Sequence, residues 1–157
     1  MIVKEIRDED FTSYKKPSMV IGFPSCTFKC ERECGKKMCQ NSALAQAPSI
    51  QIDVKDIVIR YTNNPITKAI VCAGLEPFDS YRELKQLVAE FRHITKDDIV
   101  IYTGYNKDEI RNQLAYLRCY RNIIVKFGRF IPNQQPHYDE VLGIKLASNN
   151  QYAERIS

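Results

Sequence analysis

Four short apolar segments, separated by stretches with helical periodicity, constrain the fold of this 157-residue chain most strongly. They cover residues 18–23, 66–72, 98–102 and 122–127. Each has the length and composition of a buried strand, and a turn follows it. Strands that alternate with helices form parallel sheets through right-handed crossovers. The sequence therefore predicts an α/β fold, with a mostly parallel sheet of about five strands and crossover helices.

The segments between these strands carry signals for helix starts. Asp53 is the expected N-cap of a helix over about residues 54–62. Ser80-x-x-Glu83 and Asn106-x-x-Glu109 are capping-box patterns ahead of apolar residues at helical spacing. We therefore expect one helix after each of the turns that follow the second and third strands.

The two ends of the chain are less regular. Residues 1–16 are charged and predict only an edge segment. Residues 129–157 predict a loop-rich tail with one short strand at residues 141–145. The whole chain, residues 1–157, is expected to form a single domain.

Composition excludes several classes of protein. With 44% hydrophobic and 27% charged residues, the chain resembles a globular protein, and its net charge of +4 is too small and too dispersed to predict nucleic-acid binding. No apolar stretch approaches the roughly 20 residues that cross a membrane. The chain starts without a basic segment followed by an apolar one, so we expect a cytoplasmic protein.

Four of the six cysteines lie close together after the first apolar strand: Cys26, Cys30, Cys34 and Cys39. A disulfide knot is the weakest interpretation, because clustered thiols in a reducing compartment more often bind metal. Zinc favours two short Cys pairs, and Cys34-x4-Cys39 is a loose second pair. An iron-sulfur cluster held by three of the four thiols fits equally well. The spacing alone leaves zinc, iron-sulfur and the choice of ligands open.

The remaining two cysteines, Cys72 and Cys119, stand in apolar or helical surroundings and are predicted to be small core residues. In a parallel sheet, ligands bind at the carboxyl ends of the strands. The cysteine loop, the turn at residues 74–77, the turn at 103–105 and the loop at 128–130 should therefore meet around one pocket.

Several of these segments resemble a known family. Together with the cysteine loop, the turn Gly74-Leu75-Glu76-Pro77 resembles the radical S-adenosylmethionine (SAM) superfamily. Cys39-Gln40-Asn41, Ile101-Tyr-Thr-Gly-Tyr105 and Ser148-Asn-Asn-Gln151 resemble corresponding segments in activating proteins of anaerobic (class III) ribonucleotide reductases. The family resemblance implies an open, partial TIM-like barrel as in small radical SAM activases.

The resemblance also implies a cofactor site. Cys26, Cys30 and Cys39 would hold a 4Fe-4S cluster whose fourth iron binds SAM, with no catalytic side chain beyond the cluster and SAM. The superfamily spacing is Cys-x3-Cys-x2-Cys, so an insertion separates the second and third ligands in this chain. Cys39 matches the family by its Gln-Asn continuation, which makes Cys34 a residue of the insertion.

For SAM itself, the resemblance assigns contacts to the two strand-end turns. The implied residues are Gly74, Leu75, Glu76 and Pro77 at the methionyl end and Thr103 and Gly104 at the adenosyl end. Leu75 departs from the family, which has a second glycine at this position.

The implied function is generation of a glycyl radical. Reductive cleavage of SAM would give a 5′-deoxyadenosyl radical that takes hydrogen from a backbone glycine of the reductase large chain, with flavodoxin or ferredoxin as electron donor. Two alternatives stay open: an activase or modifying enzyme for another protein or peptide, and a non-catalytic zinc- or iron-sulfur-binding module.

Overall fold

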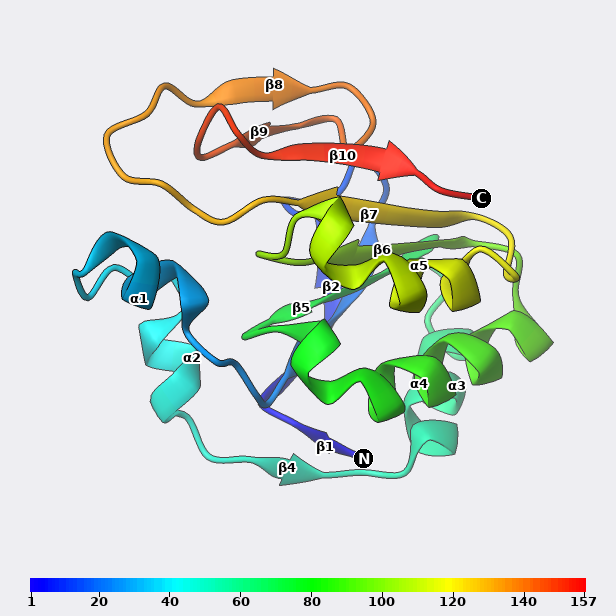
Figure 1. The fold of residues 1–157 in the computed structure, drawn as a ribbon. Coiled ribbons are helices and arrows are strands. Elements are labelled where there is room, and N and C mark those ends of the chain that lie inside the picture. The colour runs from blue at the N-terminus through cyan, green and yellow to red at the C-terminus, as the bar shows by residue number, and fades with distance from the viewer.

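A computed structural model describes residues 1–157 and contains a central six-stranded sheet (Figure 1). Its order is β10-β7-β6-β5-β3-β2. The four inner strands, β3 (Ser18–Phe23), β5 (Ala69–Gly74), β6 (Asp98–Tyr102) and β7 (Ile123–Phe127), are parallel. The edge strands β2 (Glu5–Asp10) and β10 (Tyr152–Arg155) run antiparallel to their neighbours.

Helices cover one face of this sheet. Apolar residues of α3 (Val54–Thr62), α4 (Tyr81–Ile94) and α5 (Arg111–Leu117) belong to the same buried cluster of 22 residues as alternate residues of the inner strands. Short 3-10 helices, η1 (Pro77–Ser80) and η2 (Lys107–Ile110), precede α4 and α5. This arrangement follows from β-strand geometry, because every second side chain points to the same face.

The opposite face is covered without helices. The hairpin of β8 (His137–Asp139) and β9 (Ile144–Leu146) packs there together with the segment that contains Tyr14. Leu142, Leu146 and Tyr14 share a second buried cluster with the alternate strand residues that point this way. The sheet is therefore buried on both faces, as its continuous apolar strands require.

Small elements complete the chain. Helices α1 (Lys29–Cys34) and α2 (Ser42–Gln46) lie at the end of the sheet where the parallel strands finish (Figure 1). Strands β1 (Ile2–Val3) and β4 (Ile50–Gln51) form a separate antiparallel pair, which links the N-terminus to the segment after α2.

The predicted mixed α/β fold with a mostly parallel sheet and crossover helices is confirmed, with corrections in detail. The sheet has six strands where about five were expected. It is open, and the partial TIM-like barrel that the resemblance implies stays a prediction. Strand β10 was not predicted, because Tyr152–Arg155 has no apolar run and its pairing with β7 depends on tertiary contact. The tail strand expected at residues 141–145 is displaced to β9.

All three helical segments begin directly after the expected N-cap residues, and two of the three predicted caps are formed. The Asp53 side chain accepts a hydrogen bond from the Lys55 amide at the start of α3, and Glu109 accepts one from the Asn106 amide. The capping box at Ser80 is wrong, since its side chain makes no capping hydrogen bond. The chain is already helical at Pro77, where the Glu76 carboxylate caps η1.

The two isolated cysteines differ. Cys72 is completely buried in β5, as expected, whereas Cys119 is exposed and the prediction for it is wrong. Cys119 follows α5, whose buried positions are taken by Leu114 and Leu117. A helical context alone does not tell which side of the helix a residue faces.

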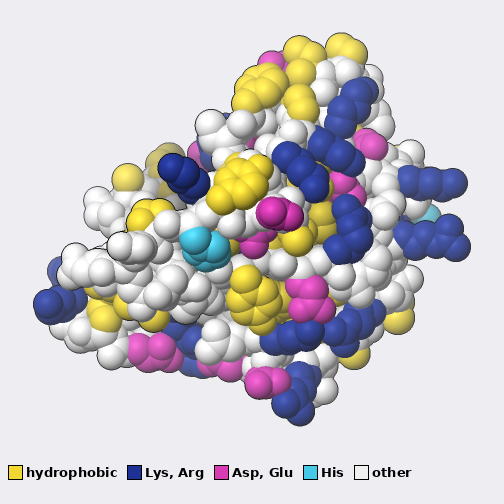
Figure 2. Space-filling view, turned by 90° about the horizontal axis from the view of Figure 1, so that it is seen from above, with side chains coloured by type: hydrophobic (Ala, Val, Ile, Leu, Met, Phe, Trp, Pro, Cys, Tyr) yellow, Lys and Arg dark blue, Asp and Glu magenta, His cyan; other side chains and the backbone are white.

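The face formed by the hairpin and β10 carries hydrophobic side chains as separate groups (Figure 2). Most of the Lys and Arg side chains in this view lie in its right half. None of the helices combines the length and the hydropathy of a transmembrane segment.

Gly74 ends β5 at a position that no other residue fits. Its φ is +92°, and a Cβ atom would lie 2.6 Å from the Phe23 backbone nitrogen. We expect Gly74→Ala to lower the free energy of unfolding by at least about 2 kcal/mol, because left-handed strain and a clash with backbone add together. Urea unfolding measures this change.

Gly35→Ala is the matched control. Gly35 also has a positive φ, +68°, but a Cβ atom would meet nothing within 4 Å. It should cost about 1 kcal/mol, from strain alone. Equal losses in the two variants would contradict the role of close packing at Gly74.

Candidate metal centre

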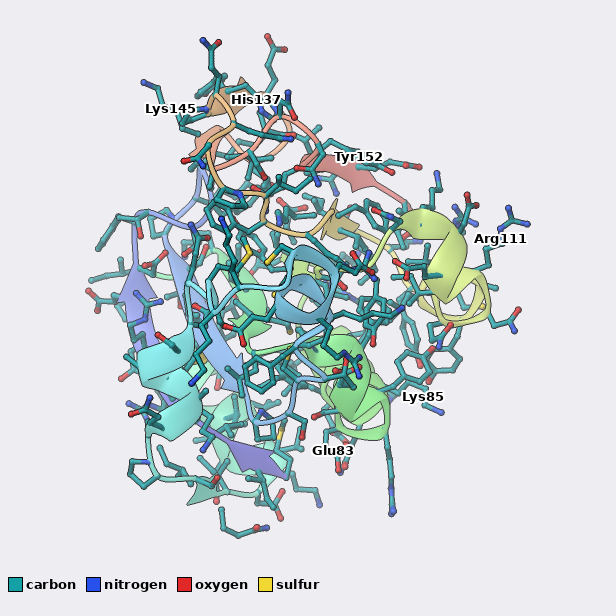
Figure 3. All side chains as sticks on the ribbon, turned by 60° about the vertical axis from the view of Figure 1, so that its left-hand side comes forward. Glu83, Lys85, Arg111, His137, Lys145 and Tyr152 are labelled. Atoms are coloured by element: carbon teal, nitrogen blue, oxygen red, sulfur yellow. The ribbon has the colours of Figure 1, made fainter.

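A cavity of about 390 Å³ opens at the carboxyl ends of the parallel strands. Cys26, Cys30 and Cys39 all line it. Cys34 does not: it lines a separate cavity of about 310 Å³, which it shares with Cys30. Figure 3 shows this side of the molecule, with Lys145 and His137 on the hairpin above α1. Cys34 is thus the one cysteine of the four that does not line the cavity at the strand ends.

The first two cysteines are placed by the exit from β3. The chain leaves the sheet after Phe23, and the Phe28 amide donates a hydrogen bond to Cys26 Sγ at 3.2 Å. Phe28 has a left-handed backbone conformation, with φ at 50°, and α1 begins directly after it. Burial raises the pKa of the Cys26 thiol to about 11 and also raises that of Cys30. Thiolate ligands therefore need a compensating positive charge, which a bound metal centre would supply.

The insertion between Cys30 and Cys39 is closed by a carboxylate. Glu31 in α1 accepts hydrogen bonds from the amides of Met38 (3.0 Å) and Cys39 (2.9 Å). These bonds bring the end of the insertion back to its beginning, so that Cys39 lines the same cavity as Cys30 despite their separation in sequence. Cys34 stays exposed at the far end of α1.

Two polar contacts fasten the cysteine loop to the strand ends. The Asn41 side-chain amide donates to the Gly74 carbonyl at 2.6 Å. At the other end of the loop, Asp79 accepts from the Thr27 amide (2.7 Å) and from the Tyr105 hydroxyl (2.6 Å). Asn41 and Tyr105 stood in segments that resemble the family, but neither their contacts nor the role of Asp79 could be found from the sequence.

Glu76 is the polar centre of the strand-end turns. Its carboxylate is 5% exposed and accepts from the Phe78 amide (3.1 Å), the Thr103 hydroxyl (2.8 Å) and the Gly104 amide (2.8 Å). Burial raises its pKa to about 7, and these hydrogen bonds oppose the rise. The carboxylate therefore joins the turn after β5 to the turn after β6. It also lines the cavity, and its contact with SAM stays a prediction.

The other predicted SAM-site residues divide into two groups. Gly74, Leu75, Thr103 and Gly104 line the cavity, as Glu76 does. Pro77 does not, because it is buried at the first position of η1. Leu75 is half-buried and stands at the position where the radical SAM motif that it resembles has a second glycine.

Lys126 is a cavity residue that sequence reasoning missed. It is 7% exposed in β7, and its ammonium donates to the Gly128 carbonyl at 3.0 Å. Burial lowers its pKa to about 8, and the charge of Glu76 opposes that shift. The signal in the sequence was a lysine inside the apolar strand 122–127, at a position that alternation places on the face away from the helices.

The tail segment Ser148–Gln151 holds the loop after β7, which lines the cavity. Gln151 Oε1 accepts from the amides of Ala147 (3.1 Å) and Ser148 (3.2 Å), and its Nε2 donates to the Gly128 carbonyl. Asn150 donates to the Arg129 carbonyl at 2.8 Å. These contacts give the segment a structural role in holding the loop after β7.

The chain matches a family model described as "4Fe-4S single cluster domain" over residues 19–152. It belongs to this family. The match spans every cysteine and every strand of the sheet except β2 and the last residues of β10. No curated protein and no solved structure matches the chain.

The residues fit such a cluster. A 4Fe-4S cluster is held by thiolates on separate irons, so its ligands need to share a cavity rather than converge on one point. Cys26, Cys30 and Cys39 share one, and no three His, Cys, Asp or Glu side chains converge as for a single ion. The family membership decides between the zinc and iron-sulfur readings in favour of the 4Fe-4S cluster.

We expect Glu31→Ala to weaken cluster binding, because the amides of Met38 and Cys39 lose their acceptor and the insertion opens. After anaerobic reconstitution with iron and sulfide, the iron content per chain should fall by at least about half. Arg32→Ala, an exposed neighbour in the same helix, is the control and should keep full iron content. Equal iron in the two variants would contradict the closing role of Glu31.

Proposed function

We propose that this 4Fe-4S domain is a radical SAM activating enzyme that generates a glycyl radical on an anaerobic ribonucleotide reductase. One observation carries the proposal. Cys26, Cys30 and Cys39 line a single cavity together with the turns after β5 and β6, and Cys34 is outside it. Three thiolates leave one iron of a four-iron cluster open for a substrate.

The protein would hold the cluster through these three cysteines and SAM through the strand-end turns. When bound, the reduced cluster supplies the electron that cleaves the sulfonium C-S bond of SAM. The chain's own part is to bind, orient and shield. Met38, Leu44 and Leu75 contribute apolar walls to the cavity and reduce the access of water.

Polar groups of the cavity suit the two ends of SAM. The Lys126 ammonium has one protein acceptor and is available to a carboxylate. Thr103 and Gly104 are held in place by Glu76, so the turn that would border the adenosyl group is already formed. Glu76 positions this turn and, as a lining residue of the cavity, would also contact the methionyl amino group of SAM.

We infer a protein substrate, the reductase large chain, from the resemblance of Cys39–Asn41, Thr103–Tyr105 and Ser148–Gln151 to the activating proteins. Flavodoxin or ferredoxin is the proposed electron donor in the cytoplasm. The open sheet, with helices on one face and the cavity at the strand ends, would correspond to the partial barrel of small radical SAM activases. An activase of another protein or peptide would use the same chemistry.

Leu75 favours a second candidate function. It lines the cavity at the position where the radical SAM motif has a second glycine, and a larger residue there suits a cluster-binding module without SAM chemistry. The two candidates differ in one measurable product. Only the enzyme forms 5′-deoxyadenosine from SAM under strong reductant.

Anaerobic reconstitution followed by reduction with dithionite tests the proposal. The wild-type protein should be brown and form 5′-deoxyadenosine, and Cys34→Ala should do the same. Cys39→Ala should lose the cluster and the product, because only two cavity thiols remain. A brown wild-type protein that leaves SAM intact would support the module instead. A glycyl radical signal on mixing with the reductase chain identifies the substrate.

A further expectation concerns Lys126. Lys126→Met keeps the length of the side chain and removes its charge, so the affinity of the reconstituted protein for SAM should fall by about tenfold or more. Decarboxylated SAM lacks the carboxylate, so its affinity should be the same for the wild-type protein and for Lys126→Met. Equilibrium dialysis measures both ligands. An equal loss for both would indicate that the substitution damages the cavity rather than a carboxylate contact.

A further inference from the structure

We propose that Glu109 is a positioning residue for the cluster. It binds Lys29 of α1 and Arg129 after β7 at the same time, and in this way it fixes the position of Cys30. The proposal rests on Cys30 as a cluster ligand and does not depend on SAM chemistry. Glu109 lies in η2, far from the cysteines in sequence. Its effect on the cluster would pass through the neighbour of Cys30, Lys29.

Helix α1 needs such an anchor. None of its six residues is buried, so apolar packing does not hold it in place. A helix of this length is also unstable by itself in water. Its position must come from polar contacts at its surface and from the bonds at the two ends of the cysteine loop.

Glu109 makes an unusually complete set of contacts for a surface carboxylate. It accepts from Arg129 Nη1 (2.8 Å) and Nη2 (2.7 Å), from Lys29 Nζ (2.7 Å) and from the Asn106 amide (2.8 Å). Hydrogen bonds, first from the Arg129 guanidinium and then from Lys29, lower the pKa of Glu109 to about 2. The carboxylate thus remains charged across the physiological range of pH.

Arg129, which binds Glu109, is itself held by neighbouring residues. Arg129 is 8% exposed, and its carbonyl is held by Asn150. The ring of Tyr105 lies beneath both cations, 5.1 Å from Lys29 Nζ and 5.7 Å from the Arg129 guanidinium carbon. Cation-π attraction therefore adds to the ion pairs at the same point.

The charges also define the register of α1. Lys29 and Glu33 are four residues apart and share one face of the helix. Lys29 meets Glu109, and the Glu33 carboxylate lies 3.2 Å from Arg129 Nε. A shift of the helix by one turn would bring like charges together. This alternating pattern selects one position for α1 and therefore for Cys30.

The test uses Lys29→Met, Glu109→Gln and the double variant. In the apo protein, hydrogen exchange of the amides of residues 30–34 should accelerate by about tenfold in each single variant, because charge-assisted bonds that hold α1 are lost. In the reconstituted protein, iron should pass to a chelator faster by a similar factor. The double variant should be no worse than either single one, as for two groups in one interaction.

Two matched controls separate positioning from general damage. Lys107→Met removes a lysine with 39% side-chain exposure, against 40% for Lys29, from an ion pair with Glu154. Asp108→Asn neutralises the residue next to Glu109, which pairs with Arg111. Neither should change exchange in α1 or iron release.

Additive losses, or unchanged exchange in α1, would overturn the proposal. So would faster exchange with unchanged iron release, because α1 would then move without consequence for the cluster. If Glu109→Gln fails to fold, Lys29→Met still decides, since it leaves the Glu109–Arg129 pair intact. None of these measurements uses SAM cleavage, so a failure of the enzymatic function is seen separately.

Discussion

A buried carboxylate joins the strand ends on which the cavity depends. Glu76 binds the turn after β6 through Thr103 and Gly104 while it caps the helix that follows β5. Burial without these partners would cost several kcal/mol and would favour the neutral acid. Because three donors surround it, the two turns keep one relative position, and the cysteine loop is then fastened to them at Gly74 and Asp79.

The molecule combines two kinds of stabilisation. The sheet is held by apolar burial on both faces, with the helices on one side and the hairpin on the other. The cysteine-bearing segment is held almost entirely by hydrogen bonds and ion pairs, since α1 and α2 bury no residue. A cluster site built in this way can tolerate an insertion between its ligands, provided that a group such as Glu31 closes the added loop.

Local patterns predicted the elements that are regular in themselves. Strands β3, β6 and β7 and helix α3 follow from apolar runs and from Asp53 at the N-cap. Strand β10 and the exposure of Cys119 were not predictable, because they depend on which surface is already covered. For the site, the sequence predicted that the cysteines and the strand-end turns lie at one edge of the sheet. It did not predict that Glu76 accepts hydrogen bonds from two of these turns, or that Lys126 lines the cavity.

The fold class follows from the order of apolar strands and helical segments, and four cysteines after the first core strand predict a metal centre. Periodicity and thiol chemistry are local properties, so they can be read along the chain. The set of thiols that line the cavity depends instead on the folded arrangement. Cys34 and Cys39 belong to the same short segment, but the Glu31 hydrogen bonds return Cys39 to the cavity and leave Cys34 outside. That choice depends on contacts made through space.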